Sequence, residues 1–317
     1  MRAIEVARYG GPEELVPVER ADPVAGPGEV VVRAEAVDTI YVETQIRGGW
    51  GERFGFVPPF VPGGAAAGTV VSVGPGVAGD WLGRRVVAAP GTKGTYAELV
   101  RVPLERLIPV PDGLDLREAA ALAHDGVTGT ALVEGVGIGP GERVLILGAA
   151  GGMGTLLVQR AVAAGAHVVA AARGERKLAL VRSLGARTVV DYSEPDWTER
   201  VGGAVDVLLD GVGGALGTAA FALVRDGGRV SAHGAPSGGF TPIDPAEAER
   251  RGITLRGIAE LQLPAAEVTR LGALALAEAA AGRLRPVIAR TFPLARAADA
   301  HRAIEAREIA GKALLIP

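Results

Sequence analysis

The segment LGAAGGMG, residues 147–154, has four glycines and no charged side chain. It follows the apolar run RVLI and precedes TLLVQRAVAAGA, which is typical of a helix. Three of its small residues take the positions of the G-x-G-x-x-G dinucleotide motif: Ala149, Gly151 and Gly154. Small residues let the backbone approach a pyrophosphate, and the N–H groups near Gly152 and Met153 would point at the anion. The alternative is a tight strand-to-helix turn in which the glycines only let the two elements touch.

Basic side chains after the next expected strands bear on which dinucleotide is bound. An NAD site usually has Asp or Glu about 20 residues beyond the loop, where it holds the ribose 2′-OH. Here the strand HVVAAAR ends on Arg173, and a guanidinium suits a 2′-phosphate better than a hydroxyl that needs an acceptor. Lys177 lies one helical turn further on, and Tyr192 ends the third strand. Each alone would be typical of a solvated surface residue, but as a set they favour NADPH.

Other common chemistries find no support in the sequence. The chain has no cysteine, and its four histidines do not stand at metal-ligand spacing. An Asp/His metal site stays open, but no pattern proposes one, so we expect no metal. The segment APSGG, residues 235–239, lacks the G-x-S-x-G pattern of an acyl-transfer nucleophile.

The elements that must position these residues fall into two kinds. Up to about residue 110, short strands such as EVVVRAEAV, GTVVSVG, RRVVAAP and GTYAELVRVP alternate with Gly/Pro turns. This pattern predicts a mostly antiparallel, partly barrel-like β domain. From about residue 115, strands and helices alternate as far as ITLRGI (253–258), which predicts a Rossmann-type, doubly wound parallel sheet and an α/β fold. We expect a catalytic domain over 1–121 and 261–317 and a cofactor domain over 122–260.

Composition narrows the class of protein further. The chain has 317 residues, a length that suits two domains, with 48% hydrophobic and 22% charged residues. A net charge of −3 without a basic block argues against nucleic acid as a partner. The N-terminal residues show no signal-peptide pattern, and no apolar run approaches the roughly 20 residues of a membrane-spanning helix. We therefore expect a cytoplasmic protein with no membrane partner.

The motifs, taken in order, resemble a known family. They are YGGPEEL (9–15), GPGEVVVRAEAV, PPFVPGGAAAGTVVSVG (58–74), GTYAELVRVP (94–103), LGAAGGMG, ERKLALVRSLGA (175–186), DYSE, LDGVGG (209–214) and GKALLIP. The series resembles the zinc-independent medium-chain dehydrogenases/reductases of the quinone oxidoreductase type. This resemblance implies a GroES-like catalytic domain split around a cofactor domain, NADPH as cofactor, and hydride transfer to quinones or α,β-unsaturated carbonyls. It also implies a homodimer in which ITLRGI pairs across a two-fold axis.

The resemblance implies roles for particular residues of the cofactor domain. Gly152 and Met153 would meet the pyrophosphate, and Thr128 in GVTGTA would lie near the phosphates or the nicotinamide. Val212 and His233, after the fourth and fifth strands, would lie beside the nicotinamide. The 2′-phosphate would be held by three residues: Arg173, Lys177 and Tyr192.

The expected catalytic side departs from the family pattern. Asp38 and Tyr41 stand in the positions where the family usually has Asn and Asp, and Ala65 replaces an acidic residue. Trp50 and Phe54 occupy the region where the family often has a tyrosine. The pocket is therefore remodelled, and the family's substrate does not transfer to this chain.

Three side chains are candidates for contact with the substrate. Tyr41 is the leading hydrogen-bond donor to an oxygen that becomes negative as hydride is added, with a packed aromatic as the alternative. Asp38, an acceptor when ionised, would orient the substrate or the nicotinamide carboxamide, with a structural turn as the alternative. His124, in ALAHDGVTG, would face the cleft or be a structural histidine. Shape alone, holding nicotinamide and acceptor face to face, would supply much of the catalysis.

These observations predict an NADPH-dependent reductase of quinones or enones. Two alternatives stay open because the catalytic-side residues have changed while the cofactor side has not. One is an NADPH-binding sensor or scaffold without turnover, and the other is a biosynthetic tailoring reductase for a large polycyclic acceptor. An alcohol dehydrogenase fits less well, because the zinc ligands of that class are missing.

Overall fold

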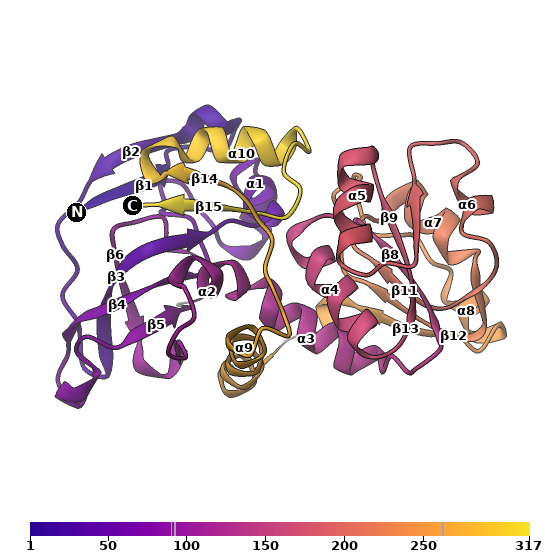
Figure 1. Ribbon diagram of the computed structural model, residues 1–317. Coiled ribbons are helices and arrows are strands. Elements are labelled where there is room, and N and C mark those ends of the chain that lie inside the picture. Colours follow the sequence, from indigo (N-terminus) through magenta and orange to yellow (C-terminus); the bar gives the residue numbers. More distant parts are fainter. Residues whose placement is uncertain (90, 92, 262) are drawn as a thin grey trace. The chain divides into compact units, whose positions relative to one another are not determined.

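The computed structural model describes residues 1–89, 91, 93–261 and 263–317. The chain forms two compact units (Figure 1). The first unit consists of Met1–Val127 and Pro264–Pro317, and the second of Thr128–Leu263. Pro90, the last residue of the expected strand RRVVAAP, lies outside the described residues. No helix among the described residues is long and apolar enough to cross a membrane.

The second unit is built on six parallel strands. They are β8 (Arg143–Leu147), β9 (His167–Ala172), β10 (Thr188–Asp191), β11 (Val205–Asp210), β12 (Val224–Ala232) and β13 (Thr254–Gly257). Their order across the sheet is β10-β9-β8-β11-β12-β13, which is the doubly wound dinucleotide-binding order. The predicted Rossmann-type sheet is therefore confirmed. The strand order reverses between β8 and β11, where ligands of such sheets bind beyond the carboxyl ends of the strands.

Both faces of this sheet are buried, because successive strand side chains point to opposite sides. Val144 and Ile146 of β8 belong to one apolar cluster, and Leu145 and Leu147 belong to the other. The first cluster is covered by α3 (Asp125–Val136), α4 (Gly152–Ala163) and α5 (Glu175–Ser183). The second is covered by α6 (Trp197–Arg200), α7 (Gly214–Phe221) and α8 (Pro245–Arg250). A short 3-10 turn, Ile258–Glu260, follows β13.

The first unit contains a two-stranded and a seven-stranded sheet. The small sheet pairs β1 (Arg2–Val6) with β2 (Leu15–Glu19). The large sheet contains β3 (Glu29–Asp38), β4 (Ala66–Val73), β5 (Arg85–Ala88), β6 (Leu99–Pro103), β7 (Leu107–Pro109), β14 (Ile288–Pro293) and β15 (Lys312–Ile316). Its order is β14-β15-β3-β4-β5-β7, with β6 also on β3. Among the described residues of this sheet, β14 and β15 are the only neighbours that pair in parallel, so the predicted mostly antiparallel β domain is confirmed.

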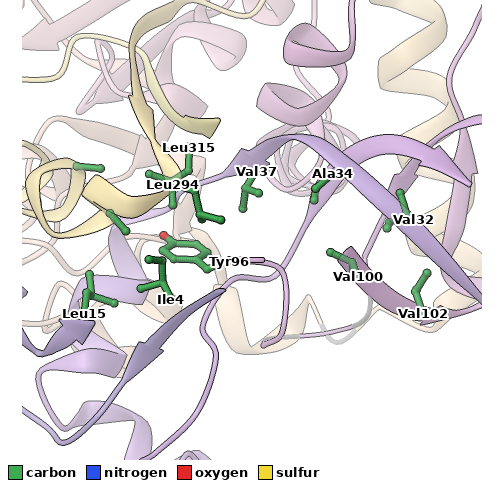
Figure 2. Packing of buried hydrophobic residues seen from close by; sticks show 14 of the residues in the cluster. Ile4, Leu15, Val32, Ala34, Val37, Tyr96, Val100, Val102, Leu294 and Leu315 are labelled. Carbon is green, nitrogen blue, oxygen red and sulfur yellow. The ribbon is translucent and has the colours of Figure 1, made fainter. Parts of the chain in front are cut away.

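Helices close the first unit around an apolar core. They are α1 (Tyr41–Arg47), α2 (Leu116–Leu122), α9 (Ala265–Ala280) and α10 (Ala297–Glu305), with 3-10 turns at Pro12–Glu14, Trp50–Phe54, Gly79–Trp81, Leu104–Arg106 and Leu294–Arg296. Figure 2 shows Tyr96 in this core, whose aliphatic side chains include Ile4, Val37 and Leu315. Residues 264–317 supply α9, α10, β14 and β15, so the C-terminal part of the chain completes this unit.

The helical pattern after residue 115 divides into two helices. Asp115 caps the first, its carboxylate accepting a hydrogen bond from Arg117 N at 2.7 Å. The helix α2 ends at Leu122, and α3 begins at Asp125. His124 therefore lies at the junction between the helices. The helix α3 runs through the boundary between the two units.

Candidate functional site

The glycine loop, residues 148–151, follows β8 directly and leads into α4. Gly148 has a φ of +69°, a conformation that favours glycine. Its carbonyl oxygen accepts a hydrogen bond from Gly151 N at 2.9 Å, and Ala149 N donates to Ala171 O at 3.1 Å. A Cβ on Gly154 would lie 2.3 Å from Gly148 O, so the close approach of helix and loop requires a glycine there.

The N-terminus of α4 has the geometry of an anion site. Gly151 occupies its N-cap position, and no side chain accepts a hydrogen bond there. The first N–H groups of the helix, at Gly152 and Met153, therefore point outward with the positive end of the helix dipole. Both residues are half-buried. A pyrophosphate fits this arrangement, because it would accept from these N–H groups without meeting a side chain.

Thr128 lies close to this point through α3. A Cβ on Gly129 would lie 3.9 Å from Met153 Cγ, so α3 packs against the first turn of α4 at that residue. Thr128 directly precedes Gly129 in the helix and is half-buried. The structure thus brings the neighbourhood of Thr128 and that of Met153 together within the second unit.

The three candidates for the 2′-phosphate follow β9 and β10. Arg173 is exposed directly after β9, while Lys177 in α5 and Tyr192 after β10 are half-buried. Because β9 and β10 are parallel neighbours with Ala172 opposite Asp191, these side chains start from the same edge of the sheet.

Asp191, which had no predicted role, organises this edge. Its carboxylate accepts hydrogen bonds from Gly174 N at 2.8 Å and Ser193 N at 2.9 Å. Partial burial works to raise the pKa of Asp191, but the hydrogen bonds from Ser193 and Gly174 and the charge of Arg173 hold it below its usual value. Asp191 is therefore ionised at neutral pH, and it fixes the backbone that follows Arg173.

Val212 and His233 lie beyond the carboxyl ends of β11 and β12. Val212 is buried, whereas His233 is half-buried and donates through its backbone N–H to Asp210 O at 3.0 Å. The buried Asp210 carboxylate accepts from Val212 N at 2.9 Å and Gly213 N at 2.8 Å, and also from the Thr241 hydroxyl. Asp210 thus sets the shape of the loop that carries Val212. Asp210 lies in the sequence motif LDGVGG, but the spacing of that motif alone did not predict that its carboxylate binds the loop backbone.

Asp38 lies in the first unit, at the end of β3, and only 3% of it is exposed. Lys312 Nζ lies 2.6 Å from Asp38 Oδ1 and 3.1 Å from Asp125 Oδ2. The register of β3 with β15 pairs Asp38 with Leu314, which puts Lys312 just beyond the strand end. Asp38 is therefore part of a strand and a buried ion cluster. It ends β3 just before the turn into α1, so the orienting role and the structural turn role both stay predictions. We call Asp38, Asp125, Lys312 and His124 the lysine cluster.

Burial and the charges of neighbouring groups set the pKa values in the lysine cluster. Burial raises the pKa of Asp38 to about 7, against the opposing pull of the Lys312 charge. At Asp125 burial acts in the same direction, but Lys312 and His124 outweigh it and lower the pKa to about 2. Lys312 stays charged, because the two carboxylates more than offset its burial. The Asp125 carboxyl is therefore ionised at neutral pH, whereas the Asp38 carboxyl gains or loses its proton near pH 7.

Tyr41 begins α1 and is half-buried. The guanidinium carbon of Arg307 lies 4.2 Å from the centre of its ring, within cation–π range. Arg307 follows α10, so this contact joins α1 to the segment after α10 within the first unit. Tyr41 and Asp38 flank the turn between β3 and α1, but only Asp38 enters the lysine cluster.

A second buried polar group in the first unit, centred on Tyr96, was not expected from the sequence. Tyr96 OH donates to Glu43 Oε2 at 2.7 Å and lies 3.0 Å from His301 Nε2. Glu43 also accepts from Ile40 N at 3.1 Å and from Gly64 N at 3.2 Å. Burial lowers the pKa of His301 to about 3, so its ring is neutral. The cluster joins α1 to α10 and to the segment that contains Gly64.

The remaining departures from the family pattern lie in the same unit. Ala65 is buried, and its carbonyl accepts a hydrogen bond from Asp38 N at 3.0 Å. Trp50 is 38% exposed, and the side chain of Phe54 lies outside the described residues. Within the described part of the chain, no three His, Cys, Asp or Glu residues are grouped so that they could hold a metal ion.

The fold and the glycine loop together define a protein of the dinucleotide-binding class with a separate β domain. Comparison with known proteins makes this specific. Residues 26–112 match the alcohol dehydrogenase GroES-like domain, and residues 184–315 match the zinc-binding dehydrogenase family. The chain is 33% identical to 2-haloacrylate reductase of Burkholderia sp, over 99% of this chain and 98% of that protein.

Two further relatives agree. Quinone oxidoreductase of Sus scrofa is 31% identical over 100% of this chain and 98% of its own length. The crystal structure of Escherichia coli quinone oxidoreductase complexed with NADPH superposes with a TM-score of 0.91 at 28% identity, covering 100% of both chains. The chain therefore belongs to the medium-chain dehydrogenase/reductase family, in its zinc-independent quinone oxidoreductase type, as the sequence motifs predicted.

Proposed function

We propose that this protein is an NADPH-dependent reductase of quinones or α,β-unsaturated carbonyls. The observation that carries the proposal is the uncapped N-terminus of α4 beside the glycine loop, with Arg173 following the neighbouring strand. The loop and the helix suit a pyrophosphate, and the guanidinium suits a 2′-phosphate. Relatives named as quinone oxidoreductases and a 2-haloacrylate reductase support the reaction class.

Different cofactor-binding residues would contact different parts of the dinucleotide. Gly152 and Met153 would hold the pyrophosphate through their N–H groups. The 2′-phosphate would be held by Arg173, Lys177 and Tyr192. The nicotinamide end would lie near three residues: Thr128, Val212 and His233. The bound NADPH supplies hydride to the β-carbon of the acceptor.

On the acceptor side, Tyr41 would donate a hydrogen bond to the oxygen that becomes negative. A phenol suits this role because it stays protonated near neutral pH, and a donor aimed at developing charge lowers the barrier. The cation of Arg307 over the ring adds positive potential at the same place. Asp38, paired with Lys312, would act as a positioning residue for the turn that leads to Tyr41.

The test is NADPH oxidation with a panel of quinones, enals and bulky polycyclic enones. Oxidation with small quinones or enals is the expected result. Activity confined to the polycyclic acceptors would instead assign a biosynthetic tailoring reductase. Tight NADPH binding without oxidation of any acceptor would overturn the reductase and leave a sensor or scaffold.

The proposal includes a homodimer in the cytoplasm, with small molecules as its other partners. The strand β13 is at one end of the sheet order of the second unit, and its residues are exposed or half-buried. A strand at the end of a sheet pairs readily with another strand. Light scattering in solution would report the mass of two chains, and a monomer at micromolar concentration would contradict the dimer.

A further inference from the structure

The carboxylate of Asp191 connects two turns at the carboxyl edge of the parallel sheet in the second unit. Asp191 is the last residue of β10, and the strand register pairs it with Ala172, the last residue of β9. One carboxylate oxygen, Oδ2, accepts a hydrogen bond from Gly174 N at 2.8 Å, in the turn after β9. The other, Oδ1, accepts from Ser193 N at 2.9 Å and from the Ser193 hydroxyl at 2.5 Å, in the turn after β10. The same side chain therefore holds both turns.

The two backbone N–H groups held in this way directly follow two of the residues expected at the 2′-phosphate. Arg173 precedes one of these N–H groups, and Tyr192 precedes the other. Lys177, the third expected residue, lies in the first turn of α5, and its N–H donates to Gly174 O at 3.0 Å. All three side chains therefore start from backbone that is bonded to Asp191 directly or through Gly174.

The turn after β9 depends on this hydrogen bond because of the residue at its centre. Gly174 has a φ of +79°, a conformation that favours glycine, and it occupies the N-cap position of α5. Glycine also loses more conformational freedom on folding than any other residue. Within the described part of the chain, nothing lies within 4 Å of a Cβ placed on Gly174, so the turn is open to a ligand. The bond to Asp191 thus restrains a residue that is otherwise free to adopt many conformations.

The charge of Asp191 strengthens these bonds but does not suit direct contact with a phosphate. The carboxylate is ionised at neutral pH, because the hydrogen bonds and the charge of Arg173 outweigh burial and hold its pKa low. An ionised acceptor forms stronger hydrogen bonds with N–H groups than a neutral one. Three bonds from the two turns occupy most of the acceptor positions of the carboxylate. A phosphate would be repelled by the same charge, so the contribution of Asp191 lies in what it positions.

We propose that Asp191 is a positioning residue that determines cofactor preference. By holding the turns after β9 and β10, it places three side chains for the 2′-phosphate of NADPH: Arg173, Lys177 and Tyr192. This inference rests on the NADPH site proposed above. NADH has a hydroxyl in place of the 2′-phosphate, so the positioning contributes to the binding of NADPH and little to the binding of NADH. A residue that only stabilised the fold would affect both cofactors alike.

The experiment measures the dissociation constants of NADPH and NADH by calorimetry for wild type, Asp191→Ala and Asp191→Asn. In Asp191→Ala both turns lose their restraint, so NADPH should bind about tenfold more weakly, while NADH should change by less than about twofold. Asp191→Asn keeps one oxygen that accepts from one of the two turns, so its NADPH affinity should lie between those of wild type and Asp191→Ala. Glu194→Ala is the matched control, because it removes an exposed acidic side chain from the same turn and should weaken neither cofactor.

A double-mutant cycle with Arg173→Ala tests whether Asp191 acts through the phosphate-binding side chains. In the Arg173→Ala background, Asp191→Ala should weaken NADPH binding by about threefold instead of tenfold, because one of the groups that it positions is already absent. A purely structural aspartate would give the same loss in both backgrounds. The full tenfold loss in both would therefore overturn the positioning of Arg173 by Asp191.

Equal losses of NADPH and NADH affinity, or wild-type NADPH affinity in both Asp191 variants, would overturn the positioning role while the NADPH site stands. If Asp191→Ala does not fold, the comparison of NADPH with NADH in Asp191→Asn decides the question in the same way. No NADPH binding by wild type would overturn the proposed function, and this role of Asp191 with it.

Discussion

Lys312 Nζ lies 2.6 Å from Asp38 Oδ1, and both side chains are only 3% exposed. The two residues come from nearly opposite ends of the chain, and the pairing of β15 with β3 brings them together. The same ammonium group lies 3.1 Å from Asp125, which begins α3. One buried charge therefore joins the last strand, the central strand and the helix that leads into the second unit.

The Asp38–Lys312 pair should make stability depend on pH. The folded-state pKa of Asp38, about 7, exceeds its ordinary value of 3.8, so the folded protein binds this proton more tightly than the unfolded chain. The resulting stability is present below pH 3.8 and is lost as pH rises through 7. Wild type should lose about 2 kcal/mol more than Asp38→Asn between pH 5 and 8, as measured by urea unfolding. Asp112→Asn, at an exposed aspartate, is the control, and parallel behaviour of Asp38→Asn and wild type would contradict the prediction.

His301 should make the stability of the protein depend on pH in the opposite direction to Asp38. Burial and the nearby charge of Arg47 lower its folded-state pKa from 6.5 to about 3. Its contribution to stability is therefore present above pH 6.5 and is lost as pH falls toward 3. Between pH 7 and 5, wild type should lose about 2 kcal/mol that His301→Gln does not lose, whatever the variant's absolute stability. An exposed-site control, His167→Gln, should follow wild type, and a wild-type slope in His301→Gln would refute the assignment.

Arg173→Ala should weaken the binding of NADPH more than the binding of NADH. Removing a guanidinium from a phosphate should weaken NADPH binding by about 10- to 100-fold, because charge-assisted hydrogen bonds contribute about 1.5–3 kcal/mol. NADH lacks the 2′-phosphate, so its binding should change little. Calorimetry with both cofactors measures the difference. Arg182→Ala, which removes an exposed arginine of α5, should leave both affinities unaltered; equal losses for NADPH and NADH in Arg173→Ala would remove the 2′-phosphate argument.

Gly154→Ala should damage the glycine loop. Its methyl group would lie 2.3 Å from Gly148 O and 2.7 Å from the carbonyl carbon of Ala149, so the loop or the helix must move. We expect a loss of about 1–3 kcal/mol in the free energy of unfolding, as for other overpacked sites, together with weaker NADPH binding. Gly79→Ala, where nothing lies within 4 Å of the added Cβ, provides the comparison in thermal unfolding. Full NADPH affinity in Gly154→Ala would show that the loop geometry does not matter for the cofactor.

Tyr41→Phe should affect turnover and leave cofactor binding intact. The ring and its contact with Arg307 remain, so only the hydroxyl is lost. We expect kcat to fall by about 10- to 100-fold, since removing one donor to a developing oxyanion costs a few kcal/mol at most. Steady-state kinetics with a quinone and an enal would measure kcat, and NADPH titrations would measure the cofactor affinity. Wild-type kcat for every acceptor would assign Tyr41 to packing alone.

Much of the second unit was predictable because its signals are local. A strand, a small-residue loop and a helix follow one another without a break from Arg143 to Ala163, and the βαβ alternation that continues after them predicts a doubly wound parallel sheet. The position of Arg173 directly after β9 was predictable for the same reason, and its role at the 2′-phosphate stays a prediction. Asp191 and Asp210 were not identified, because a carboxylate that binds backbone N–H groups looks in sequence like any loop aspartate.

The first unit shows where local pattern stops being informative. Its strands were recognisable, but the partners of Asp38, Glu43 and Tyr96 lie far along the chain, and only the closed sheet brings them together. Burial then changes their chemistry, because desolvation shifts the pKa of a carboxylate or an imidazole by an amount that no sequence spacing encodes. The sequence by itself determined the cofactor-binding architecture and the family. Tertiary structure decided that Asp38 is paired with Lys312 and that His124 is next to a fixed carboxylate, because both depend on contacts between distant segments in a region shielded from water.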